Sequence, residues 1–280
     1  MKASFQTQLH EIQSSKQSHL CVGLDPDPAR MPSGLAASSS VANAVLEFTE
    51  CIIHATSPFV SAFKFNIAFF EALGTDGFRV LKEALSCTPE GITTIADAKR
   101  GDIGNTARFY AKAFFEDLNF DAITISPYMG SDSVRPFLEY EGKGVFLLVR
   151  TSNPGGNEFQ TLMVNHEPVY QIVARTAAGW AADLPGSLGF VVGATNLDEL
   201  SHLRTAHPDV PFLIPGVGIQ GGDAVSVMNS AGSGPVLINS SRQILYASDR
   251  DDFAQKAAEQ AELLCLELRE ARHSKPQRLR

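Results

Sequence analysis

The strongest candidates for chemistry are three charged residues in the stretch "ITTIADAKRGDIGNT", residues 92–106. Asp97, Lys99 and Asp102 follow an apolar run that is typical of a buried strand. Because side chains alternate along a strand, Asp97 and Lys99 would share one face with Ile95, and the residues between them would pack under helices. A lysine held between carboxylates stays cationic and suits electrostatic catalysis or proton donation. The alternative is a surface ion-pair cluster, which would contribute little to stability.

Other apolar runs also end in residues that could act on a ligand. Asp25 closes the first run, and Lys64 lies near the end of the second. Ser152 begins a Gly/Pro/Asn loop after the fifth run, and Ser126 follows the fourth. Charges at several strand ends together favour a reaction site over a surface cluster. For each hydroxyl alone, ordinary loop chemistry is an equally good explanation.

A phosphate site is indicated near the end of the chain. The segments "PGVGIQGGD" (215–223) and "INSSRQIL" (238–245) follow the seventh and eighth runs, where phosphate sites of barrels frequently lie. Glycine lets backbone N–H groups approach an anion, and Arg242 and Gln220 add donors. The letters "GVGIQG" also fit a dinucleotide fingerprint, but the required carboxylate about 20 positions later is missing from "NSSR". Glycines that serve a tight turn are a further alternative.

These residues need elements that bring strand ends together, and the sequence alternates accordingly. Eight short apolar runs cover residues 19–25, 59–66, 92–99, 120–127, 144–152, 188–195, 210–218 and 235–241. Segments of helical period lie between or after them, at residues 41–55, 105–118, 167–184 and 251–270. This alternation predicts a parallel sheet with crossover helices, and eight units fit a (β/α)8 TIM barrel. An open, doubly wound sheet is the alternative.

The same pattern gives expectations about boundaries. We expect a single domain over residues 1–280, with a barrel core at about 15–265 between an N-terminal helix and a basic C-terminal tail. A helix should begin with Asn105 or Thr106 near its cap. His54 and His166 fall in segments of helical period.

Composition excludes several classes of function. The chain has 280 residues, 44% of them hydrophobic, and its formal net charge of −8 disfavours non-specific nucleic-acid binding. The sequence shows neither a membrane-length apolar run nor a signal-peptide pattern, so no membrane partner is expected. Four separated cysteines without a CxxC pair predict reduced thiols in a cytoplasmic protein. The seven histidines lack metal-ligand spacing, so no metal site is expected.

The motif "DAKRGDIGNT" (97–106), with DxKxxDIxxT spacing, resembles the signature of the orotidine 5′-phosphate decarboxylases. Further motifs match in order, namely "GLDPD", "KFN", "TSNPGG", "PGVGIQGGD" and "SSR", after the first, second, fifth, seventh and eighth runs. The resemblance extends over all eight predicted units and points to the longer bacterial branch of the family. It implies a lyase that converts orotidine 5′-phosphate to UMP and CO2 in de novo pyrimidine biosynthesis, without a cofactor.

The resemblance also implies roles for matching positions. Lys99 would protonate C6 of the pyrimidine, Asp97 would face the scissile carboxylate, and Asp25 and Lys64 would hold the ribose hydroxyls. Ser152 would contact the amide edge of the pyrimidine, with Ser126 as the alternative for this contact. Pro215 would lie against the ring. The phosphate would be bound by Gln220, Gly221, Arg242 and backbone amides near Ser241.

Two residues of the motif are expected to act across a subunit interface. By resemblance, Asp102 and Thr106 would reach into the partner subunit's site, so the active unit would be a homodimer. The chemistry is consistent with this site, because loss of CO2 from C6 leaves an electron pair that no ring carbonyl delocalises. An ammonium group fixed beside C6, here that of Lys99, would stabilise and then protonate it.

Two other functions are compatible with parts of the sequence. A metal-dependent phosphosugar decarboxylase or aldolase, such as 3-keto-gulonate 6-phosphate decarboxylase, resembles the chain at DxKxxD. Those relatives use an acidic metal ligand after the second strand, where this chain has Lys64, Phe65 and Asn66. A non-catalytic phosphate-binding barrel is the other possibility, but it would be expected to have lost Lys99 or the acids around it.

Overall fold

Eight parallel strands form a closed barrel in the computed structural model, which describes residues 3–35, 40–218 and 223–273. The strands follow the order β1-β10-β9-β8-β5-β4-β3-β2 around the barrel. They are β1 (Leu20–Leu24), β2 (Ala62–Asn66), β3 (Thr93–Arg100), β4 (Ala122–Ile125), β5 (Gly144–Arg150), β8 (Ser187–Val192), β9 (Phe212–Pro215) and β10 (Val236–Ser240). Each of the predicted apolar runs overlaps one of them, and only β3 and β8 extend beyond their runs, by one residue each. The predicted (β/α)8 barrel is confirmed, and the doubly wound alternative is wrong.

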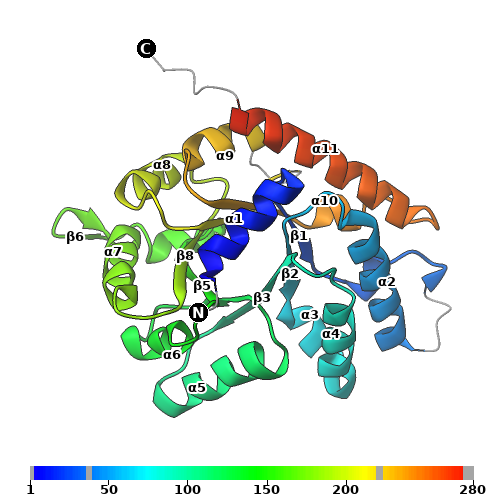
Figure 1. Ribbon diagram of the computed structural model, residues 1–280, viewed down its shortest axis with the longest axis horizontal. Helices are drawn as coiled ribbons and strands as arrows, with labels where there is room; N and C mark the ends of the chain where they lie inside the picture. Colours follow the sequence, from blue (N-terminus) through cyan, green and yellow to red (C-terminus); the bar gives the residue numbers. More distant parts are fainter. Residues whose placement is uncertain (1–2, 36–39, 219–222, 274–280) are drawn as a thin grey trace.

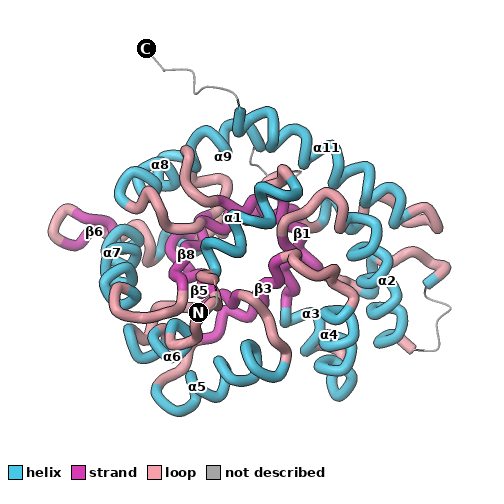
Figure 2. Tube along the Cα trace, viewed as in Figure 1, coloured by secondary structure: helices cyan, strands magenta, loops and turns pink. Residues whose placement is uncertain are grey.

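Helices surround the strands as an outer ring (Figures 1 and 2). The longer ones are α2 (Val41–Thr56), α4 (Gly77–Ser86), α5 (Gly104–Lys112), α7 (Val169–Ala181), α8 (Leu197–Ala206), α9 (Ala224–Ala231) and α11 (Phe253–His273). Short helices are α3 (Ile67–Glu71), α6 (Arg135–Leu138) and α10 (Arg242–Leu245), and a π-helical turn at Ala113–Asp117 extends α5. No helix in the described ranges is long and apolar enough to cross a membrane.

Two local expectations are wrong. The segment 167–184 does not begin as a helix, because β6 (Met163–Val164) and β7 (Glu167–Pro168) form a small antiparallel hairpin before α7. His166 lies in the tight turn of that hairpin with a φ of +66°. Helix α5 begins at Gly104, with Ile103 rather than a hydroxyl or amide residue at its N-cap.

Every strand contributes one inward side chain to an apolar cluster inside the barrel, which we call the apolar layer. It contains Cys21, Ala62, Ile95, Ala122, Phe146, Val191, Leu213 and Leu237. Helix α1 (Phe5–Lys16) lies across this end of the barrel (Figure 1) and adds Phe5 and Leu9 to the same cluster. Two residues further along β2 and β3, the inward positions are Lys64 and Asp97. The apolar layer therefore forms a closed floor under the charged residues.

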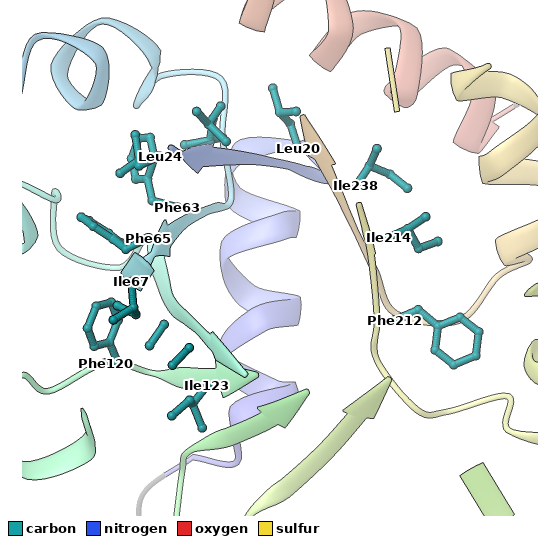
Figure 3. Packing of buried hydrophobic residues seen from close by; sticks show 14 of the residues in the cluster. Leu20, Leu24, Phe63, Phe65, Ile67, Phe120, Ile123, Phe212, Ile214 and Ile238 are labelled. Carbon is teal, nitrogen blue, oxygen red and sulfur yellow. The ribbon is translucent and has the colours of Figure 1, made fainter. Parts of the chain in front are cut away.

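The opposite faces of the strands pack under the outer helices. Figure 3 shows Phe65 and Phe120 on one side of the barrel and Ile214 and Phe212 on the other, all pointing away from its axis. In β3 this outer face includes Ala96 and Ala98, as the alternation predicts. Burial on both faces explains why the strands are nearly continuous apolar runs. It also confines ionisable groups to the strand ends.

Candidate active site

A cavity of about 270 Å³ opens at the carboxyl ends of the strands. Most of the residues predicted for the site line it, namely Asp25, Lys64, Asp97, Ser152, Pro215, Ser241 and Arg242. Gln220 and Gly221, which were predicted at the phosphate, lie outside the described residues. The cavity is thus built from the ends of β1, β2, β3, β5, β9 and β10, which only closure of the barrel brings together.

Asp97 is the centre of the charged cluster. Its two carboxylate oxygens accept separate hydrogen bonds, from Lys64 Nζ at 2.8 Å and from Lys99 Nζ at 2.7 Å. Thr124 Oγ1 on β4 donates a third at 2.9 Å. Within one chain the predicted order of charges is therefore reversed, because a carboxylate lies between two lysines rather than a lysine between two carboxylates.

Lys64 and Asp97 each shift the pKa of the other in favour of the charged form. Burial alone would raise the pKa of Asp97, but the ammonium groups of Lys64 and Lys99 outweigh it and hold this pKa well below its usual range. Burial alone would lower the pKa of Lys64, but the carboxylates of Asp97 and Asp25 hold it above its usual range. Both groups are therefore ionised at neutral pH, although Lys64 is only 4% exposed.

Lys99 is the more accessible of the two lysines, with 51% of its side chain exposed. Its backbone has a φ of +46°, a region that non-glycine residues seldom occupy. The pairing of β3 with β4 also shifts between Ala96 and Arg100. The hydroxyl of Thr124 accepts a hydrogen bond from the Lys99 backbone N–H at 2.9 Å, which supports this conformation. The amine consequently projects from an irregular strand end, and remains tied to the cavity through Asp97.

Asp25 contributes a carboxylate that has an unsatisfied oxygen. Oδ1 of Asp25 is buried without a hydrogen-bond partner among the described residues. A loop anchor fixes its backbone, because the Tyr246 hydroxyl donates to the Asp25 carbonyl at 2.7 Å. A buried acceptor without a partner is costly, so this oxygen is well suited to receive a ligand hydroxyl.

The side of the cavity formed by β9 and β10 can accommodate an anion. Gly216 and Gly218 have φ values of +97° and +109°, so the loop after β9 needs residues without a side chain. Arg242 is exposed at the start of α10 and makes no ion pair among the described residues. An arginine fork beside backbone N–H groups is a typical phosphate-binding arrangement.

The two serines that competed for the pyrimidine contact lie in different places. Ser152 lines the cavity, and Ser126 is absent from its described lining. The backbone of Ser126 instead pairs with the end of β3, where its N–H donates to the Arg100 carbonyl at 2.8 Å. The geometry therefore favours Ser152 for a ligand contact.

Asp102 and Thr106 do not line the cavity of their own chain. Asp102 is half-buried, and its Oδ1 accepts a hydrogen bond from the Ile103 N–H at 2.8 Å. Thr106 is exposed in the first turn of α5. Large apolar side chains around them are also exposed, with Ile103 at 54% and Phe109 at 64%.

The sequence interpretation missed several polar residues of the site. Thr124 binds Asp97, and Asn239 and Gln243 line the cavity beside Ser241. Asn239 precedes Ser241 by two positions in the last strand, so alternation could have identified it. Thr124 could be recognised only from the pairing of β3 with β4, because nothing in its own segment distinguishes it.

The described residues contain no group of three or more His, Cys, Asp or Glu side chains arranged to hold a metal ion. The cavity offers the ammonium group of Lys64, two carboxylates and an anion-binding end, while Lys99 is outside its described lining and reaches it through the ion pair with Asp97. This combination can bind a phosphorylated ligand at one side and act on it electrostatically or by proton transfer at the other.

Comparison with known proteins agrees with this geometry. The sequence model of the orotidine 5′-phosphate decarboxylase / HUMPS family matches residues 18–257. A protein of Dehalococcoides mccartyi named orotidine 5′-phosphate decarboxylase is 46% identical over 266 residues, covering 92% of this chain and 94% of its own length. One from Delftia acidovorans with the same name is 47% identical over 262 residues, covering 91% and 94%.

A solved structure extends the similarity to the fold. Leishmania donovani OMP decarboxylase superposes with a TM-score of 0.84 at 37% identity, and the match covers 97% of this chain and 100% of that one. The barrel, its site-bearing strand ends and its flanking helices therefore all fall within the matched region.

Proposed function

Because this chain belongs to the orotidine 5′-phosphate decarboxylase family, we propose that it decarboxylates orotidine 5′-phosphate to UMP, in pyrimidine biosynthesis. The observation that carries the proposal is the Lys64–Asp97–Lys99 chain of ion pairs, at 2.8 and 2.7 Å, beside a cavity with an anion-binding end. A substrate that has a phosphate at one end and a carboxylate at the other fits this distribution of charge.

In this mechanism Lys99 stabilises the carbanion that forms at C6 and then donates a proton to it. Its side chain is exposed enough to approach a ligand, while Asp97 limits where the amine can lie. An ammonium group that is already oriented stabilises developing negative charge without reorganisation during the reaction. The C–C bond electrons remain on C6, CO2 leaves, and the new C6–H bond takes its proton from Lys99.

Asp97 has two roles in the proposal. It orients both lysines, and its low pKa keeps a negative charge close to where the substrate carboxylate would bind. Repulsion between these carboxylates is relieved when CO2 departs, which favours the transition state over the bound substrate. Asp25 and Lys64 hold the ribose hydroxyls, while Pro215 lies against the ring and Ser152 contacts its amide edge.

The phosphate would bind between the loop after β9 and Arg242, with Gln220, Gly221 and the backbone near Ser241. These phosphate contacts lie away from the reacting carbon, so the binding energy they provide can position the base above Lys99.

The direct test follows the ultraviolet absorbance of orotidine 5′-phosphate mixed with purified, EDTA-treated protein. We expect turnover that EDTA does not reduce, and loss of turnover in Lys99→Ala with UMP binding still measurable. The matched control is Lys82→Ala, which removes an exposed lysine on α4 that pairs with Asp117. Near-normal turnover in Lys99→Ala would contradict the assignment. An EDTA-sensitive reaction on a phosphosugar would favour the metal-dependent alternative, and ligand binding without turnover would favour a non-catalytic barrel.

We further propose that the active unit is a homodimer in which Asp102 and Thr106 complete the partner subunit's site. The support is an exposed apolar surface around them, formed by Ile103, Phe109, Tyr128 and Met129, of which Tyr128 is 91% exposed. Tyr128 and Met129 follow β4, and Met129 lies against the loop that precedes Asp102. Contiguous exposed apolar side chains typically mark an interface, and a second copy of the chain would also supply the carboxylate that Lys99 lacks on its far side.

A further inference from the structure

We infer that a network of polar groups behind Ser152 sets the position of this residue and thereby determines recognition of the pyrimidine base. The inference rests on the proposed function, which assigns Ser152 to the amide edge of the base. We call this network the Ser152 cage and define it by the six residues Arg150, Thr151, Gln160, Gly193, Asn196 and Glu199.

The cage first fixes the backbone that leads into Ser152. The Thr151 N–H donates to Gln160 Oε1 at 2.9 Å, and the Thr151 carbonyl accepts from Asn196 Nδ2 at 3.1 Å. Gln160 Nε2 also donates to the Thr151 hydroxyl at 2.9 Å. The residue immediately before Ser152 is therefore held at both backbone polar groups and at its side chain, by groups from two different loops.

Arg150 joins these loops to each other. Its guanidinium is buried, with a side chain 6% exposed, and donates to Asn157 Oδ1 at 2.7 Å. It also donates to Gln160 Oε1 at 3.3 Å and pairs with Glu199 on α8 at 3.3 Å. A buried charge is stable only when it is paired in this way. Arg150 is absent from the described cavity lining, so its contacts organise the loop rather than bind the ligand.

Gly193, at the end of β8, limits the position of Ser152 from the other side. A Cβ atom at this position would lie 2.7 Å from Ser152 N and 2.8 Å from Ser152 Cβ, closer than non-bonded atoms approach. The Gly193 N–H also donates to the Arg150 carbonyl at 2.7 Å. Only glycine leaves room for the observed path of the chain at Ser152.

The cage leaves the hydroxyl of Ser152 free to contact a ligand. Ser152 is exposed at the cavity, and its hydroxyl has no hydrogen-bond partner among the described residues. Its neighbours, by contrast, are tied by several side chains. Rigid support of a ligand-facing group that is itself unpaired is the arrangement expected for a recognition residue, because the position is set before the ligand binds.

The test compares two ligands that share the ribose phosphate and differ in the base. We expect Gly193→Ala and Gln160→Ala each to weaken UMP binding about tenfold, the equivalent of one lost hydrogen bond. Binding of ribose 5-phosphate should change by less than about twofold, since the phosphate end is untouched. With orotidine 5′-phosphate, KM should rise while kcat changes little, because the base contact is made equally in the bound substrate and in the transition state. Calorimetry measures the affinities.

Matched controls separate positioning from general damage. Gly179→Ala adds the same methyl group on α7, where nothing lies within 4 Å, and Gln6→Ala removes a glutamine hydrogen bond at the other end of the barrel. Both should retain wild-type affinities. If Gly193→Ala does not fold, Gln160→Ala still decides the question. Unchanged UMP binding, or an equal loss for both ligands, would overturn the inference. Absence of turnover by the wild-type protein would instead overturn the proposed function.

Discussion

At the scale of single residues, Asp97 is one carboxylate that pairs with two lysines of very different exposure. Lys64 is 5% exposed along its side chain and Lys99 is 51% exposed, although both contact Asp97 within 2.8 Å. A buried ion pair that loses one partner leaves an uncompensated charge, whereas water can replace a partner at the surface. The two lysines should therefore differ in their contribution to stability.

This difference can be measured. We expect Lys64→Met to lower the free energy of unfolding by about 3 kcal/mol, because Asp97 and Asp25 would lose their buried counter-charge. Lys99→Ala should change it by less than about 1 kcal/mol, since its ammonium group is half-exposed. Urea denaturation monitored by circular dichroism gives both values. Equal losses in the two variants would contradict the expectation that Lys64 stabilises the fold more than Lys99 does.

At the scale of elements, α1 closes the end of the barrel opposite the active site. Leu9 is 1% exposed and packs with Phe5 against the apolar layer of the strands. This layer separates the charged residues above it from water below, so α1 protects the low-polarity floor of the site without contributing to the cavity.

Truncating a buried side chain of α1 should reduce the stability of the protein but leave kcat unchanged. We expect Leu9→Ala to cost about 2–5 kcal/mol, through lost burial and the cavity left behind. The control Leu263→Ala, at a side chain 61% exposed on α11, should cost less than about 0.5 kcal/mol. Thermal and urea unfolding measure the effect. A fall in kcat of the folded Leu9→Ala protein would show that α1 influences the site directly.

His19, which directly precedes β1 and lies near the end of α11, also predicts a pH dependence. Burial, followed by the positive charges of Arg272 and His273, lowers the pKa of His19 to about 4. Between the ordinary histidine pKa and this value, the unfolded chain binds a proton that the folded chain does not. Stability therefore falls as pH is lowered through this interval and is fully present above it.

We expect His19→Gln to reduce the loss of unfolding free energy between pH 7 and pH 4 by about 2 kcal/mol, after allowance for partial exposure. His54→Gln, at an exposed histidine on α2, is the matched control and should follow the wild type. Urea titrations at several pH values provide the comparison. Parallel curves for the wild type and His19→Gln would show that His19 titrates normally in the folded protein.

At the scale of the whole molecule, the main prediction concerns sites shared between subunits. Lys99→Ala and Asp102→Ala should each be inactive alone. In a mixed dimer one site carries both substitutions, and the other combines an intact Lys99 with an intact Asp102. After subunits have exchanged freely, an equal mixture should regain about one quarter of wild-type activity, since about half the dimers are mixed and each has one working site.

The assay is turnover of orotidine 5′-phosphate after mixing and dilution. As a control, Lys99→Ala mixed with Lys64→Met should regain nothing, because both residues belong to the same subunit's site. A mixture of Lys99→Ala and Asp102→Ala that also stays inactive, despite proven subunit exchange, would contradict the shared site.

The expectations of one domain over residues 1–280 and of a cytoplasmic location stay predictions.

The sequence by itself determined the positions of the strands and the types of group at their ends. Both are local properties, because a strand buried on two faces requires an unbroken apolar run and can carry charges only where it ends. Asp25, Lys64, Asp97 and Arg242 could thus be identified from the sequence. Local rules failed at α5 and at the hairpin before α7, where turn geometry outweighed side-chain preference.

Only the tertiary structure decided how these groups meet. Closure of the barrel and the pairing of β3 with β2 and β4 place Asp97 between Lys64 and Lys99 and bring Thr124 beneath them. The approach of Gly193 to Ser152 likewise joins strands whose segments are about 40 positions apart. Such contacts depend on strand register and on the distances between loops, and neither is encoded in the local period of the chain.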